Sequence, residues 1–185
     1  MKYVALLRAI NVGGRNLIRM ADLRACLEVR KFERVSTYIQ SGNILFDSDV
    51  IDAVVLTAAI ERALSETFGR EVRVFLRSHA QMKKLIAGAP KGWKNATDVR
   101  TNVAFLRPPL TAKHALTAIV ATEGVDSLHA GDGVVYMSTL LARAGQSSLS
   151  KVVSKSIYAN ITVRNFTTCQ KILALMDADC PRRTT

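Results

Sequence analysis

Cysteine, histidine and long apolar runs are scarce in this sequence. Its three cysteines, Cys26, Cys169 and Cys180, cannot all pair within one chain, and none of them forms a CxxC motif. Three scattered histidines without cysteine or carboxylate at ligand spacing argue against a metal site. No apolar window approaches the roughly 18 residues that a membrane span needs. We therefore expect reduced thiols, no bound metal, no cofactor and no membrane partner.

Leader and catalytic signatures are also missing. The N-terminus, residues 1–4, runs directly into an apolar pattern that is typical of a strand, and no small-residue cleavage site follows it. The sequence contains no GxSxG, no HExxH and no pair of acids in an evident environment. These absences predict a cytoplasmic protein and leave open whether it is an enzyme.

The chain does carry a large apolar fraction and an excess of positive charge. Apolar residues make up 49% of its 185 residues, which is ample for a packed core. Its 26 basic and 15 acidic residues give a net charge of +11, most of it after residue 78. Such a field attracts phosphates, nucleic acids or acidic partners without defining a site. A general solubility charge explains it equally well.

The first half follows the order strand, helix, strand, strand, helix, strand. Alternating and helical apolar patterns predict these elements over residues 2–10, 20–30, 33–40, 44–46, 51–68 and 72–77. Cys26 falls on the apolar face of the first helix and is interpreted as a core residue. Gly69 is placed to end the second helix in the left-handed conformation. This order is that of a ferredoxin-like domain.

The second half begins the same cycle again. Ser78 is expected to cap a helix, and the polar stretch 87–98 is interpreted as a linker. Strands are predicted over 102–106, 125–129, 134–138 and 160–165, with helices from Thr111 to about 121, from Ser147 or Ser148 to about 158, and over 170–176 opened by Thr167 or Thr168. The prediction is an α+β chain of two ferredoxin-like (βαββαβ) α/β-plait domains: residues 1–78, a connecting helix and linker at 79–99, and an irregular second domain at 100–185.

Three stretches resemble a known family. "ALLRAINVGGRNLIRMADLRACLE", "RVSTYIQSGNILF" and "TVRNFTT" are similar to the bacterial proteins catalogued as domain of unknown function 1697. The resemblance covers nearly the whole chain and is strongest over residues 4–46. It implies two ferredoxin-like halves, and the family carries no established activity. Arg19 and Phe166 stand where the family often has proline and tryptophan.

The stretch "RAINVGGRN", residues 8–16, is the strongest candidate for a binding site. Consecutive glycines allow positive φ, so that successive N–H groups can point into one concavity, and the helix that follows adds its positive end. Arg8, Arg15 and Arg19 bracket the loop. The pattern lacks the GxGxxG or glycine-lysine-serine spacing of nucleotide loops, and an ordinary turn also explains the glycines. We predict a small anionic ligand, bearing phosphate or carboxylate, at Arg8, Asn11, Gly13, Gly14, Arg15 and Asn16.

Other polar turns are weaker candidates for the same ligand. Ser41 and Asn43 in the "SGN" turn suit hairpin geometry, but Tyr38 and Gln40 beside them are expected near the open edge of the sheet, where a ligand can be contacted. Lys151 follows a serine pair, and Arg164 and Asn165 precede the last helix. Helix capping explains both stretches. The functional interpretation is that Lys151, Arg164 and Asn165 contact a ligand held in a cleft between the two halves.

Two alternatives to a small ligand remain open. The basic surface favours nucleic-acid binding, for which the first and third strands offer Tyr3 and Phe46 as stacking residues. The glycine-aromatic signature of RNA-binding sheets is missing, and aromatic content is just 6%. The other alternative is a structural or regulatory module that forms a homodimer by burying an open sheet face.

Overall fold

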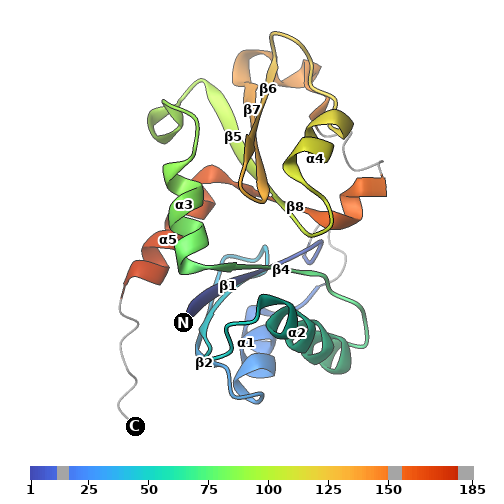
Figure 1. Ribbon diagram of the computed structural model, residues 1–185, viewed down its shortest axis with the longest axis vertical. Helices are drawn as coiled ribbons and strands as arrows, with labels where there is room; N and C mark the ends of the chain where they lie inside the picture. Colours follow the sequence, from blue (N-terminus) through green and yellow to red (C-terminus); the bar gives the residue numbers. More distant parts are fainter. Residues whose placement is uncertain (12–16, 150–155, 179–185) are drawn as a thin grey trace. The chain divides into compact units, whose positions relative to one another are not determined.

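The computed structural model describes residues 1–11, 17–149 and 156–178. The chain splits into two compact units, one of Met1–Met82 with the residues from Ile172, the other of Lys83–Lys171. Each unit is built on a four-stranded antiparallel sheet (Figure 1). Among the described residues, no helix is long and apolar enough to cross a membrane.

The first unit has the predicted ferredoxin-like order. Its elements are β1 (Lys2–Leu7), α1 (Met20–Glu28), β2 (Glu33–Tyr38), β3 (Asn43–Asp47), α2 (Ala53–Phe68) and β4 (Val74–Ser78). The strands lie in the order β2-β3-β1-β4. β1 and β2 end earlier than predicted because Ala9 and Ile39 adopt positive φ, which breaks an extended strand.

Two helices seal one face of this sheet. α2 begins at Ala53, two residues later than predicted, because the side chain of Asp52 caps it by accepting from two backbone N–H groups. It ends as predicted at Gly69, whose φ is 66°. Leu56, Ile60 and Leu64 of α2 lie in one buried cluster with the helix-facing residues of β1, β3 and β4. Residues on the opposite face of the sheet are also buried: Val4, Leu6, Leu45 and Phe75.

The second unit repeats this topology with different connections. Its sheet has the order β6-β7-β5-β8, made of β5 (Val99–Leu106), β6 (Asp126–Gly131), β7 (Val134–Leu140) and β8 (Ile161–Asn165). α4 (Ala112–Ala118) follows β5 and is capped by Thr111 as predicted, although it ends three residues early. The remaining helical elements are α3 (His79–Ala87), α5 (Phe166–Asp177) and the 3₁₀ helices η1 (Trp93–Asn95), η2 (Leu141–Gln146) and η4 (Ser156–Asn160).

One predicted helix start is wrong, and another precedes a 3₁₀ turn. Leu149, directly after Ser148, has 3₁₀ geometry and donates its N–H to the Ser147 hydroxyl at 3.3 Å, while both serines are also bound to the carboxylate of Asp126. Residues 150–155 of the predicted helix lie outside the described residues. α5 begins before Thr167, since the side chain of Asn165 accepts a hydrogen bond from the Thr167 N–H at 2.9 Å. Asn165, rather than a threonine, is therefore its cap.

The stretch interpreted as a linker contains a buried aromatic residue. Trp93 is 8% exposed and makes edge-on ring contacts with Tyr136 and Phe166, at centroid distances of 5.7 and 5.4 Å. All three rings belong to the second unit. The glycine- and proline-containing sequence around Trp93 gave no sign of this packing, because the contacts come from residues far along the chain.

Candidate functional site

Asn11 fastens the two ends of the loop that follows β1. Its amide nitrogen donates to the carbonyls of Ile18 and Gln40, both at 2.9 Å, and its oxygen accepts the Ile18 N–H at 2.7 Å. The side chain of Asn11 therefore has a structural role in closing the loop. The predicted ligand contacts Gly13, Gly14, Arg15 and Asn16 lie outside the described residues.

Three arginines reach the ends of this loop. The backbone N–H of Arg8, directly after β1, donates to the carbonyl of Arg73 at 3.0 Å. The guanidinium of Arg70 donates to the carbonyl of Leu17, at the far end of the loop, at 3.4 Å. Sequence reasoning found Arg8 but missed Arg70 and Arg73. The signal was the antiparallel pairing of β1 with β4, which brings the start of β4 beside the end of β1.

Arg19, which the sequence also placed beside the loop, is engaged by α1. Its guanidinium binds both carboxylate oxygens of Asp22, at 2.8 and 3.0 Å. The hydrogen bond from this carboxylate raises the pKa of Arg19. Arg73 makes a looser pair, with its Nε 3.3 Å from Glu71 Oε1. Arg19 therefore serves the first turn of α1, while Arg73 keeps a weaker carboxylate contact with Glu71.

The "SGN" turn has internal contacts that explain its residues. Gly42 has a φ of 70°, and a Cβ there would lie 2.5 Å from the Ile10 side chain, so neither the conformation nor the space suits another residue. Asn43 is fully buried, and its amide donates to the carbonyl of Tyr38 at 2.9 Å and to the Ser41 hydroxyl at 3.1 Å. These contacts serve the hairpin. A ligand-binding role for Ser41 and Asn43 stays a prediction.

Arg164 and Asn165 belong to the second unit, and both have neighbours there. Arg164 is 8% exposed and donates to the Thr162 hydroxyl at 3.0 Å and to the Val163 carbonyl at 2.9 Å. Burial lowers the pKa of Arg164 to about 10 and raises that of Cys169 to about 12. Lys151 lies outside the described residues. The predicted ligand site between the halves stays a prediction.

The two residues expected to stack on nucleic-acid bases are buried. Tyr3 and Phe46 are 3% and 2% exposed and stack on each other at a centroid distance of 5.8 Å within the core. They offer no ring face to a nucleotide base. Both faces of both sheets carry buried side chains, including Val103 and Phe105 of β5. The base stacking expected of these two residues is therefore not available, and the homodimer stays a prediction.

No metal-binding group is evident in the part of the chain that the structure describes. There, no three histidine, cysteine, aspartate or glutamate side chains lie close enough together to hold an ion. His79 instead lies 2.6 Å from the carboxylate of Asp177. Cys26 and Cys169 are both buried, free thiols, in line with the interpretation of Cys26 as a core residue.

The sequence and the fold both match known proteins. The family described as "Protein of unknown function (DUF1697)" matches residues 1–136. The chain belongs to this DUF1697 family. Among solved structures it is similar to the conserved bacterial protein SP0830 from Streptococcus pneumoniae, with a TM-score of 0.83 and 25% identity over 95% of this chain and 98% of that one. The search of curated proteins found no match. The resemblance seen in the sequence and the fold of two ferredoxin-like halves are thereby confirmed.

Proposed function

We propose that this DUF1697 protein binds a small phosphate- or carboxylate-bearing molecule at the end of β1. The observation that carries the proposal is that the backbone of Arg8 bonds to that of Arg73 at one end of the loop, while the Arg70 guanidinium reaches the Leu17 carbonyl at the other end. The glycine pair within that loop supports it, because consecutive backbone N–H groups there would add donors for an anion.

Arginine suits this role for physical reasons. A guanidinium stays charged, offers a planar fork of donors and matches carboxylate and phosphate oxygens in pairs. Glu71 contacts Arg73 but is 80% exposed, and an exposed ion pair of this kind contributes little energy. An incoming anion can therefore replace it at small cost. The net charge of +11 raises the rate at which anions meet the protein.

Calorimetric titration tests the proposal. The full chain is titrated with inorganic phosphate, succinate and AMP at physiological ionic strength. Replacing Arg8 and Arg73 together by alanine removes two of the three guanidinium groups, and we expect the affinity for the bound probe to fall by about tenfold or more. The control replaces Arg24 and Arg62, exposed arginines on α1 and α2, by alanine and should bind as well as the native chain.

Three results of these titrations would overturn the proposal. Absence of heat with all three probes would remove the ligand class. An equal loss in both double variants would show that net charge, and not this loop, attracts the anion. If single-stranded RNA then bound with a steep salt dependence, nucleic-acid binding through the basic surface would replace the proposal. Light scattering on the same samples would report any homodimer.

A further inference from the structure

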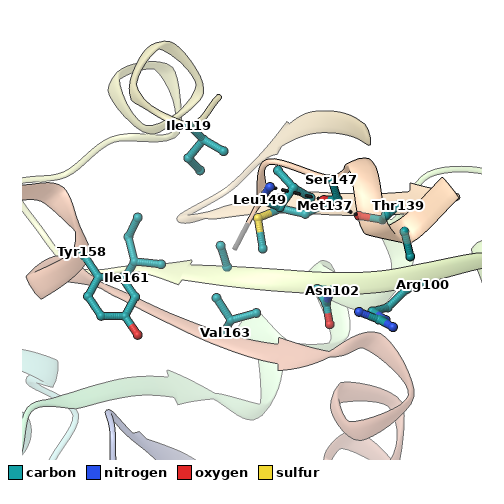
Figure 2. Close-up of a pocket in the computed structure, with 12 residues that line it drawn as sticks. Arg100, Asn102, Ile119, Met137, Thr139, Ser147, Leu149, Tyr158, Ile161 and Val163 are labelled. Carbon is teal, nitrogen blue, oxygen red and sulfur yellow. Dashed lines mark hydrogen bonds between the residues drawn. The ribbon is translucent and has the colours of Figure 1, made fainter. Parts of the chain in front are cut away.

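The second unit contains a cavity beside its sheet. Its volume is about 320 Å³, at the lower end of the range for small-molecule pockets. Three strands form its floor, and the end of α4 and the segment after β7 form its walls (Figure 2). The floor residues are Arg100, Asn102, Met137, Thr139, Ile161 and Val163.

The cavity follows from side chains at equivalent positions of the two sheets. The Leu7 N–H donates to Gly42 and the Leu106 N–H donates to Gly133, at 2.8 and 3.0 Å, so the central strands align residue by residue. This alignment and the strand registers relate the first unit's Tyr3, Phe46 and Leu76 to the second unit's Asn102, Met137 and Val163. Each of the three positions carries a smaller or non-aromatic side chain in the second unit. The counterparts of the first unit's aromatic pair, Asn102 and Met137, line the cavity of the second unit.

The cavity has a polar end and an apolar end. In Figure 2, Arg100 and Asn102 lie toward one end, while Tyr158 and Ile161 lie toward the other. Among the lining residues, Arg100 alone carries a full charge at neutral pH, and its positively charged side chain is exposed. Most of the remaining lining is aliphatic. A ligand that complements both ends carries one negative group and an apolar body.

The two hydroxyls at the polar end do not oppose such a ligand. Thr139 and Ser147 both donate to Asp126 Oδ1, at 2.8 and 2.7 Å. The second carboxylate oxygen accepts the N–H groups of Thr122 and Ser148, at 3.0 and 3.1 Å. The negative charge of Asp126 is therefore met by four donors, and its oxygens have little capacity left for a further donor. At the polar end, Arg100 and Asn102 remain as the donors with which a ligand can bind.

We propose that the second unit binds a small monocarboxylate with an apolar chain or ring. The carboxylate contacts Arg100 and Asn102, and the apolar body packs against Met137, Ile161 and Val163. Every residue of this site belongs to the second unit, so the site does not depend on the arginines beside the loop after β1. The volume suits a body of about ten non-hydrogen atoms.

The experiment titrates the full chain with hexanoate and phenylacetate, and with the neutral hexanamide and phenylacetamide. We expect the acids to bind about tenfold more tightly than their amides, because the charge-assisted hydrogen bond to Arg100 is lost in the amides. Arg100→Met should remove this preference for the acid. Lys113→Met, which removes the same charge from an exposed position on α4, should keep it.

A second variant tests the apolar end. Val163→Phe places a ring in the cavity from a side chain that is 39% exposed, and it should weaken the binding of acids and amides alike. Equal binding of acid and amide by the native chain would overturn the proposal, as would an unchanged preference in Arg100→Met. Unchanged binding in a folded Val163→Phe would place the ligand elsewhere. Arg8→Ala with Arg73→Ala should leave hexanoate binding unchanged, which separates this site from the one proposed at the loop.

Discussion

The two units share a strand order but close their sheets differently. In the first unit, helices of 9 and 16 residues cover one face and leave no residue of the central strand exposed there. In the second, α4 has 7 residues, and the second connection contains 3₁₀ helices of 6 and 5 residues. A 3₁₀ helix is short and presents no continuous apolar stripe. The two units therefore cover their sheets with helices of different length and type, and the described residues of the second unit line a cavity.

The segment between the third and fourth strands in chain order is held against the sheet by different interactions in the two units. α2 is held by the burial of Leu56, Ile60 and Leu64, which is non-directional and tolerant of small shifts. The segment after β7 is held by hydrogen bonds to one carboxylate, that of Asp126. Hydrogen bonds fix position and direction together. The hydrogen bonds to Asp126 can thus fix the segment after β7, which lines the cavity, without filling the cavity with side chains.

The largest expected effect is at the aromatic pair of the first unit. Tyr3→Asn, which gives β1 the residue found at the equivalent position of β5, should lower the free energy of unfolding by about 3–4 kcal/mol. The loss includes the stacking on Phe46 and the hydrogen bond from the Tyr3 hydroxyl to the Val50 carbonyl at 3.1 Å. Urea unfolding followed by circular dichroism measures it.

The control for that substitution is Tyr3→Phe, which keeps the ring. It should cost about 1 kcal/mol, the contribution of one hydrogen bond. If Tyr3→Asn cost no more than Tyr3→Phe, the aromatic pair would not be what closes the first unit, and the contrast between the two sheets would need another cause.

An intermediate effect is expected at the polar anchor of the second unit. Asp126→Asn puts an NH₂ group among donors and should lower the free energy of unfolding by about 2 kcal/mol at pH 7. Burial alone would raise the pKa of Asp126, but the hydrogen bonds from Thr122, Ser147, Thr139 and Ser148 outweigh it and lower the pKa. Its contribution is therefore present above the unfolded value of about 3.9 and is lost as the pH falls through the lower folded value.

Urea unfolding at pH 7 and at pH 3 measures both parts of this prediction. The difference in stability between the native chain and Asp126→Asn should shrink at the lower pH. Asp132→Asn is the matched control, since its carboxylate is 73% exposed and pairs with Lys84, and it should change stability by less than about 0.5 kcal/mol. A difference that stays constant with pH would mean that the charge of Asp126 does not anchor the segment.

The fold was predictable from sequence wherever the decisive contacts are local. Apolar periodicity located the strands and helices, and the C-terminal end of α2 and the start of α4 follow from Gly69 and Thr111, which act within one turn. The contacts of Ser147 and Ser148 with Asp126 were not predictable in this way. The Ser147 hydroxyl and the Ser148 N–H donate to this carboxylate, which lies on the far side of the β6–β7 hairpin along the chain.

The candidate sites were only partly predictable for the same reason. Arg8 was found because it stands next to the glycine loop in the sequence, whereas Arg70 and Arg73 reach that loop through the pairing of β1 with β4. No sequence motif marks the residues that line the cavity. The cavity arises because Asn102, Met137 and Val163 are too small or too polar to replace their counterparts, and only an alignment of the two sheets makes this visible.

The smallest expected effect comes from the exchange in the opposite direction, Asn102→Tyr. The ring would enter the cavity at the position that Tyr3 occupies in the first unit, and the apolar area it buries should raise the free energy of unfolding by up to about 1 kcal/mol. Hexanoate binding should be lost with it, because ring and ligand compete for one volume. Asn102→Ala, which enlarges the cavity and removes the amide, should instead keep binding and weaken it by less than tenfold. A loss of stability in Asn102→Tyr comparable to that of an overpacked core, about 1–3 kcal/mol, would show that the space in the second sheet is already filled. Both units would then have filled space beside their sheets, and they would differ only in the side chains that fill it.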